Sequence, residues 1–209
     1  MRLILFLALF STGLAFATSL IIGAFSAGDL SGWRAETFSG ETNYTLVEEE
    51  GRKVLKAQSS GAASGLYREI KIDLEQTPYL NWSWKVAGVL AGVNERTKSG
   101  DDYPARVYVV VSSALFWRTR ALNYVWSSSQ PANSHWDSAY TGNVKMLALR
   151  SGAAQAGIWV EEKRNVREDL KRLFGEDITR IDAVALMTDT DNSGQRATAW
   201  YGNIYFSAQ

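Results

Sequence analysis

Short runs of alternating hydrophobic and polar residues, separated by turn residues, recur through most of the chain. Alternation is typical of half-buried strands, because successive side chains on a strand point to opposite faces. About ten such runs in one chain predict an all-β fold, and we expect a β-sandwich. The predicted strands cover residues 43–48, 52–57, 64–72, 79–86, 106–112, 120–127, 143–150, 155–162, 178–188 and 198–206.

One segment follows a helical period instead. The apolar residues of 166–174 recur on a single helix face. Asn165 can cap this helix, with Glu168 three positions further on, and Gly175 can end it. We therefore expect one short α-helix, over residues 166–174, that covers the sandwich.

Alternation also places several polar side chains away from the core. Arg106 and Tyr108 alternate with valines, so the two side chains share the face opposite those valines. Trp159 and Glu161 likewise lie opposite the apolar face of their predicted strand. The two tryptophans of strand 79–86 share an apolar face, and we expect both to be in the core.

Composition narrows the classes of function. The 209 residues, 46% of them hydrophobic, suit one domain with a packed core. Lys+Arg and Asp+Glu number 22 each, so the basic field of a nucleic-acid binder is missing and we expect no nucleic-acid partner. The absence of cysteine excludes disulfides, a thiol nucleophile and cysteine zinc sites. The single histidine, His135, follows no Gly-x-Ser-x-Gly elbow, which disfavours a Ser-His-Asp triad.

The N-terminus has the features of a secretory signal. Arg2 supplies the positive charge, residues 3–16 the apolar stretch, and Ala17 ends a small-residue cleavage site. A signal peptide over 1–17 would leave one domain, 18–209, in the periplasm or outside the cell, with no stable membrane span after cleavage. The alternative is an N-terminal membrane anchor, because the uncharged run after Arg2 is also long enough to span a bilayer.

A loop rich in aspartate follows the predicted strand 178–188. Asp189 and Asp191 stand at alternate positions, with a glycine at the sixth, as in the first half of a calcium loop. The twelfth position is tryptophan rather than the glutamate of an EF-hand, so further ligands would have to come from Asp101 and Asp102. Two interpretations remain: a structural calcium site, or a hairpin turn in which polar side chains bond the backbone.

An aromatic ring beside charged hydrogen-bonding groups is the arrangement that a sugar ring needs, because sugars have apolar C–H faces and polar hydroxyls. The predicted ligand-binding residues are Arg106, Tyr108, Trp159, Glu161 and Arg164. The alternative for the last three is a salt bridge on the sheet face next to the helix cap. The alternative for Arg106 is an ion pair that pins the loop before it.

Several short motifs match a known family in order along the chain. They are Gly32-Trp33, Leu80-Asn-Trp82-Ser-Trp84, Gly100-Asp101-Asp102, Tyr124-Val-Trp126, Glu162-Lys-Arg164-Asn165-Val166 and Met187-Thr-Asp189-Thr-Asp191-Asn192. On these motifs the chain resembles the secreted bacterial family catalogued as domain of unknown function 3047. The resemblance implies secretion and no established activity. In outline the family is similar to galactose-binding-like sandwiches, which implies a jelly-roll-like β-sandwich of a kind that often binds carbohydrate and carries a structural calcium.

The function predicted from these observations is non-catalytic binding of a carbohydrate or cell-envelope polymer. One alternative is a glycan-active enzyme, in which Glu161 and either Asp102 or Asp189 act as acid and base on a glycosidic bond. Another is an envelope assembly protein that presents a sheet edge or an aromatic patch to a protein partner.

Overall fold

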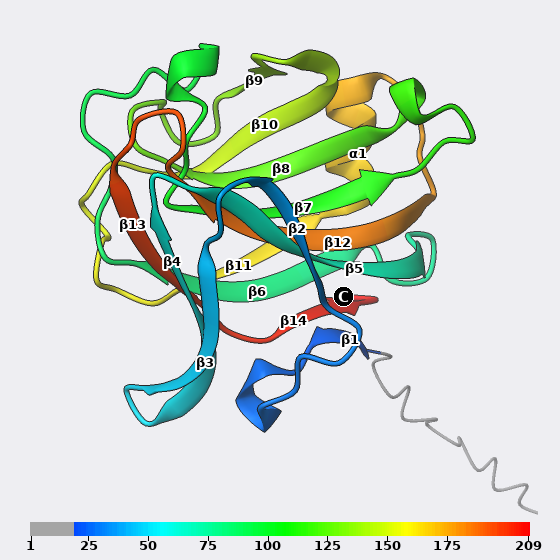
Figure 1. Cartoon of the computed structure of the whole chain (residues 1–209). Coiled ribbons are helices and arrows are strands. Elements are labelled where there is room, and N and C mark those ends of the chain that lie inside the picture. The colour runs from blue at the N-terminus through cyan, green and yellow to red at the C-terminus, as the bar shows by residue number, and fades with distance from the viewer. Residues whose placement is uncertain (1–18) are drawn as a thin grey trace, which may run out of the picture.

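The computed structural model describes residues 19–209, which form two seven-stranded sheets packed face to face (Figure 1). The first sheet has the order β1 (Ser19–Gly23), β14 (Ile204–Ser207), β6 (Tyr79–Val86), β13 (Arg196–Tyr201), β4 (Arg52–Ser60) and β3 (Asn43–Glu49), with β11 (Val160–Asn165) paired to β6. The second has the order β2 (Arg34–Ser39), β5 (Ala63–Asp73), β12 (Arg180–Asp189), β7 (Ala105–Val111), β8 (Arg120–Ser127), β10 (Thr141–Ser151) and β9 (His135–Ser138).

All strand pairs between these elements are antiparallel except β8 with β10, which run parallel. The other elements are the α-helix α1 (Val166–Phe174) and three short 3-10 helices, η1 (Phe25–Ala27), η2 (Lys98–Gly100) and η3 (Phe116–Arg118). Within residues 19–209, no helix combines the length and hydrophobicity needed to cross a membrane. The predicted signal peptide, residues 1–17, lies outside the described residues.

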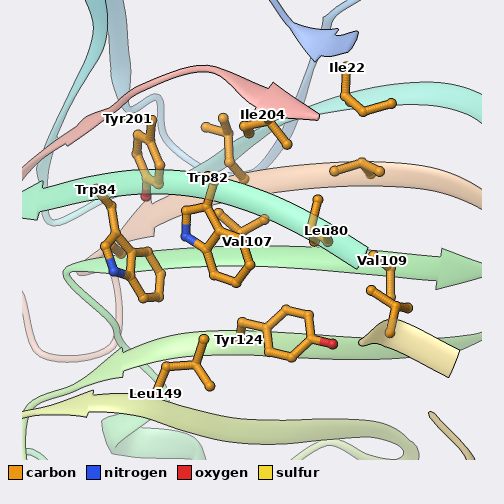
Figure 2. Close-up of a cluster of buried hydrophobic side chains, with 14 of the residues drawn as sticks. Ile22, Leu80, Trp82, Trp84, Val107, Val109, Tyr124, Leu149, Tyr201 and Ile204 are labelled. Atoms are coloured by element: carbon orange, nitrogen blue, oxygen red, sulfur yellow. The ribbon is translucent and has the colours of Figure 1, made fainter. Parts of the chain in front are cut away.

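The core fills the space between the two sheets and is rich in aromatic side chains. Trp82 and Trp84 project from β6 toward the second sheet, where Tyr124 lies on β8 (Figure 2). The ring centroids of Trp82 and Trp84 are 5.4 Å apart, and those of Trp84 and Trp126 are 5.9 Å apart. These near-perpendicular contacts are favourable for aromatic pairs. The prediction that both β6 tryptophans are buried is confirmed.

The helix forms where the sequence predicts it, over Val166–Phe174. The side chain of Asn165 accepts a hydrogen bond from the Glu168 backbone N–H, and Gly175 adopts the left-handed conformation that ends the helix. Val166 and Leu170 are fully buried in the main core. The helix therefore completes the sandwich as expected.

The predicted β-sandwich is confirmed, but it has fourteen strands in the described residues rather than about ten. The predicted strand 198–206 is divided at Gly202 into β13 and β14, and three edge strands, β1, β2 and β9, come in addition. All six residues of β2 are exposed, so this strand has no buried face that would leave an alternating pattern.

The predicted strand 155–162 is wrong in its first half. Residues 153–157 form turns, and Gly157 has a positive φ of 78° that breaks an extended strand. Ile158, which the alternation placed on the core side, is exposed, and the strand begins only at Val160. The alternation in this segment therefore did not reflect a continuous strand.

Candidate functional site

The outer face of the second sheet carries a hollow of about 660 Å³. Its floor is built from small side chains of the central strand β12, Ala183 and Ala185. Ala185 pairs in register with Tyr67 of β5 on one side and with Tyr108 of β7 on the other. Large residues therefore flank a row of small ones, which leaves a depression in the sheet surface.

Two adjoining cavities, of about 660 and 440 Å³, share Phe38 and Tyr108 in their walls. We call them together the outer groove, bounded by Phe38, Tyr67, Tyr108 and Tyr140 over the alanine floor. The lining residues come from β2 at one edge to β10 near the other. Five strand spacings of about 4.8 Å separate these strands, so the groove runs for about 24 Å across the sheet.

Tyr108 lies along the floor of the outer groove. A β-carbon placed on Gly65 of β5 would lie 3.3 Å from the Tyr108 hydroxyl oxygen, although β12 separates β5 from β7. The ring must therefore reach across β12, and a larger residue at position 65 would crowd it. Burial raises the pKa of Tyr108 to about 12, so the hydroxyl is neutral and can both donate and accept a hydrogen bond.

Two further aromatic rings stand above the floor. Phe38 is 64% exposed and Tyr140 is 55% exposed, and both border the same groove rather than standing singly on the surface. Tyr140 is held in place because its hydroxyl donates to the Lys98 carbonyl oxygen at 3.5 Å. The ammonium group of Lys98 lies 5.2 Å from the ring centroid of Tyr140, so this ring already has a cation near it. Both residues are nevertheless more than half exposed.

A wall next to the groove is built by two segments of the chain, the one that precedes β7 and the one that follows β8. Tyr103, Val125, Trp136 and Met146 form a small second core on the outer face of the sheet. Glu95 is fully buried beneath it and accepts hydrogen bonds from the backbone N–H of Ser128 and from the hydroxyl groups of neighbouring serines. A carboxylate with this many donors fixes both segments in place.

An ion pair closes the groove at its aspartate-rich end. The guanidinium of Arg106 binds both carboxylate oxygens of Asp189, with 2.9 Å between Nε and Oδ1, and lies 4.0 Å from Asp101. Asp189 is only 1% exposed. Burial raises its pKa to about 7, although Arg106 opposes this shift. The predicted alternative for Arg106, an ion pair that pins the loop before it, is present as the 4.0 Å contact with Asp101, but the closer partner is Asp189 at the end of β12.

The aspartate loop is held as a turn by a residue from another segment. Both carboxylate oxygens of Asp102 accept backbone N–H groups, from Asn192 at 3.2 Å and from Ser193 at 2.6 Å. Oxygens of Asp102, Asp189 and Asp191 lie within 4.8 Å of one another, so the three could hold an ion. All three carboxylates already have partners, however: Asp102 binds the two backbone N–H groups, Asp189 binds Arg106, and Asp191 accepts a hydrogen bond from the Asn192 side chain at 3.3 Å. These contacts favour the turn over the structural calcium site, and the calcium site is left to the test that follows.

We expect calcium to leave the thermal stability of the protein unchanged, because a cation would have to compete with Arg106 for Asp189. The melting temperature in millimolar calcium and in chelator, followed by circular dichroism, checks this. An ion that binds the folded state raises the melting temperature. A calcium-dependent rise that is lost in Asp191→Asn would contradict the expectation and establish the metal site.

The five predicted ligand-binding residues do not form one face. Arg106 and Tyr108 line the outer groove of the second sheet, whereas Trp159 and Glu161 belong to the outer side of the first sheet. Arg164 makes an ion pair with the buried Asp169 at 2.6 Å. The prediction of a single recognition face is therefore wrong, because it joined strands of different sheets.

The ring of Trp159 is already covered. The guanidinium carbon of Arg52 lies 3.7 Å from its ring centroid, and the ammonium group of Lys85 lies 5.5 Å from it. These cation–π contacts take up the surface that a sugar ring would stack on. Glu161 is exposed nearby, in a smaller hollow of about 380 Å³.

The proposed acid–base pair of Glu161 with Asp102 or Asp189 is also not assembled. Glu161 lies on the outer side of the first sheet, whereas the two aspartates lie at the outer groove of the second. Packed sheets are about 10 Å apart, and outward-facing side chains on the two sheets are further apart still. The two carboxylates of a glycosidase must be within about 10 Å of each other.

Sequence reasoning missed three of the groove aromatics, Phe38, Tyr67 and Tyr140. Phe38 belongs to the unpredicted edge strand β2 and is the only aromatic residue in it. Tyr67 is on a predicted strand, opposite the buried Leu66, and alternation could have placed it on the outer face with Tyr108. Tyr140 lies in a turn, where no periodicity applies.

Solved structures with a similar fold have low sequence identity to this chain. Cellulose induced protein Cip1 is 12% identical, with a TM-score of 0.53 over 92% of this chain and 97% of that one. The xyloglucanase domain of the type three effector NopAA from Sinorhizobium fredii, in complex with cellobiose, is 11% identical, with a TM-score of 0.48 over 94% and 100%. A family 29 carbohydrate-binding module in complex with cellulohexaose is 13% identical, with a TM-score of 0.43 over 92% of both.

At this level of identity, the likeness to Cip1 shows a shared sandwich fold. A search of curated proteins gives no match. The family model described as "Protein of unknown function (DUF3047)" matches residues 31–205, which is most of the chain and includes the six motifs given in the sequence analysis. The chain therefore belongs to the DUF3047 family.

Proposed function

We propose that this protein is exported and that it binds an extended carbohydrate chain, such as a cell-envelope polymer, in the outer groove. The observation that carries the proposal is the pair of adjoining hollows across the second sheet, together about 24 Å long and lined by four aromatic side chains. Export rests on the predicted signal peptide at residues 1–17. Lining residues from six strands of the second sheet suit a polymer better than a small molecule, which binding sites usually enclose.

The side chains of the groove match the two kinds of surface that a sugar presents. Phe38, Tyr67, Tyr108 and Tyr140 offer rings to the apolar C–H faces of sugar residues. Between the rings, polar groups such as Asn123 and Asn192 can bond the hydroxyls. Because Tyr67, Tyr108 and Asn123 belong to sheet strands rather than to loops, these three groups keep a fixed spacing, which lowers the entropic cost of binding.

Replacing Tyr108 with alanine should weaken binding of the glycan by about tenfold or more, because the ring forms the floor shared by both halves of the groove. Isothermal titration of the chain from residue 18 to 209 with hexamers of neutral and charged sugars provides the measurement. Trp159→Ala is the matched control, since it removes an aromatic ring from the first sheet instead.

Phe38→Ala gives a second test that does not depend on the core, because its ring is mostly exposed and its loss should leave the fold intact. We expect this variant to bind severalfold more weakly while it unfolds like the wild type. Retention of full affinity by both groove variants, or loss of affinity in Trp159→Ala alone, would move the site to the first sheet. Absence of binding across the whole panel would refute the proposal.

A further inference from the structure

Carboxylates outnumber cationic groups along the outer groove. Glu36, Glu69 and Asp182 line its larger half, where Lys71 is the cationic side chain. The smaller half is lined by the carboxylates of three aspartates, with Arg106 as its cationic side chain. The charge is therefore negative over both halves, even though the whole chain has equal numbers of acidic and basic residues.

The positive charge of Arg106 is not available to a ligand. Its guanidinium is bound by both oxygens of Asp189, lies 4.0 Å from Asp101, and faces the ring of Tyr103 at 4.7 Å. An anionic ligand at this end would meet carboxylates whose only guanidinium partner is already engaged. The groove therefore disfavours uronic acids and sulfated sugars through like-charge repulsion.

Carboxylates at the larger half are partly free to receive a cation. Glu36 and Glu69 are exposed on the neighbouring strands β2 and β5, and no ion pair of either is found among residues 19–209. One oxygen of Asp182 accepts the Ser112 backbone N–H at 2.8 Å, which leaves the other for a ligand. Phe38 and Tyr67 add ring faces, which attract ammonium groups.

We propose that the outer groove is selective for a glycan that carries protonated amino groups, a polymer of glucosamine type, over its neutral N-acetylated counterpart. The inference rests on the proposed function, because it assigns a substrate class to the same groove. An amino sugar retains the apolar faces that stack on the aromatic rings. Its ammonium groups can in addition pair with the carboxylates that flank those rings.

The test compares two hexamers that differ only in their acetyl groups, hexaglucosamine and its fully N-acetylated form, with hexagalacturonate as the anionic probe. Titrations are made at mildly acidic pH, where the amine is protonated, in low and in molar salt. We expect hexaglucosamine to bind about tenfold more tightly than the acetylated hexamer in low salt. Molar salt should largely remove that difference, because it screens exposed charges. Hexagalacturonate should not bind.

A double variant, Glu36→Gln with Glu69→Gln, removes two negative charges and so isolates the electrostatic contribution to the affinity. It keeps the shape of the groove and should reduce the affinity for hexaglucosamine severalfold without changing that for the acetylated hexamer. Glu161→Gln removes an exposed carboxylate from the other sheet and should change neither affinity.

Equal or tighter binding of the acetylated hexamer would overturn the amino-sugar inference and leave carbohydrate binding intact. The same holds if hexaglucosamine keeps its preference in the double variant, because the carboxylates would not be its cause. Failure of every hexamer in the neutral and charged panel would instead overturn the proposed function itself.

Discussion

Replacing Trp84 with alanine should lower the free energy of unfolding by about 3–5 kcal/mol, the range found when large aromatic residues are truncated in protein cores. Trp84 is fully buried and contacts Trp82 and Trp126 with ring centroids 5.4 and 5.9 Å away. Its indole N–H also donates to Glu162 at 3.1 Å, and this bond would be lost as well. Urea unfolding followed by tryptophan fluorescence or circular dichroism gives the value.

Phe38→Ala serves as the control for this experiment, because it removes an aromatic ring that is mostly exposed. We expect its stability to change by less than about 1 kcal/mol. A loss in Trp84→Ala no larger than that of the control would mean that the tryptophans of β6 do not organise the core.

Replacing Arg106 with methionine should destabilise the protein by up to about 3–5 kcal/mol at alkaline pH, where the buried carboxylate of Asp189 is ionised and has lost its partner. The loss should depend on pH. Burial already raises the pKa of Asp189 to about 7, and removal of the guanidinium, which lowers this pKa, should raise it further. A carboxyl group whose pKa is higher in the folded than in the unfolded state stabilises the fold at low pH. This stabilisation decreases as the pH rises from the unfolded-state pKa to the folded-state pKa.

In the wild type, the stabilisation by protonated Asp189 decreases only up to about pH 7, the pKa of this group. In the variant, where the pKa of Asp189 is higher, the stabilisation continues to decrease above pH 7. The stability difference between the two proteins should therefore grow as the pH rises above about 7, which denaturant unfolding at a series of pH values can follow. Adding Asp189→Asn to Arg106→Met removes the unpaired charge, so the double variant should show no such growth. A difference that is constant across neutral and alkaline pH would contradict the expected protonation of Asp189.

Much of the sandwich could be predicted because its central strands have one apolar and one polar face. The strands over residues 79–86 and 120–127 and the helix over residues 166–174 have the predicted bounds. The edge strand β2 could not be predicted, since all of its side chains are exposed and its only support is pairing with β5. Hydrophobic periodicity arises when one face of a strand is buried, and an exposed edge strand has no buried face to produce it.

The candidate site was only partly predictable for a related reason. Alternation correctly placed Arg106 and Tyr108 on the face opposite the core, but it contains no information about which sheet a strand joins. Trp159 and Glu161 were therefore grouped with them although they lie on the other sheet. Asp102 is predicted from the sequence as a metal ligand at the aspartate loop, whereas in the fold its carboxylate accepts the backbone N–H groups of Asn192 and Ser193. The sequence pattern cannot distinguish these two roles of a carboxylate.

The parallel pairing of β8 with β10 determines how the wall next to the outer groove is built. Parallel neighbours cannot be joined by a tight turn, so the chain must cross back between them, and here the returning segment carries β9. That segment brings Trp136 onto the outer face, where it packs with Val125 and Met146. A hairpin between β8 and β10 would contain no such segment, so this part of the wall exists only because the two strands run in the same direction.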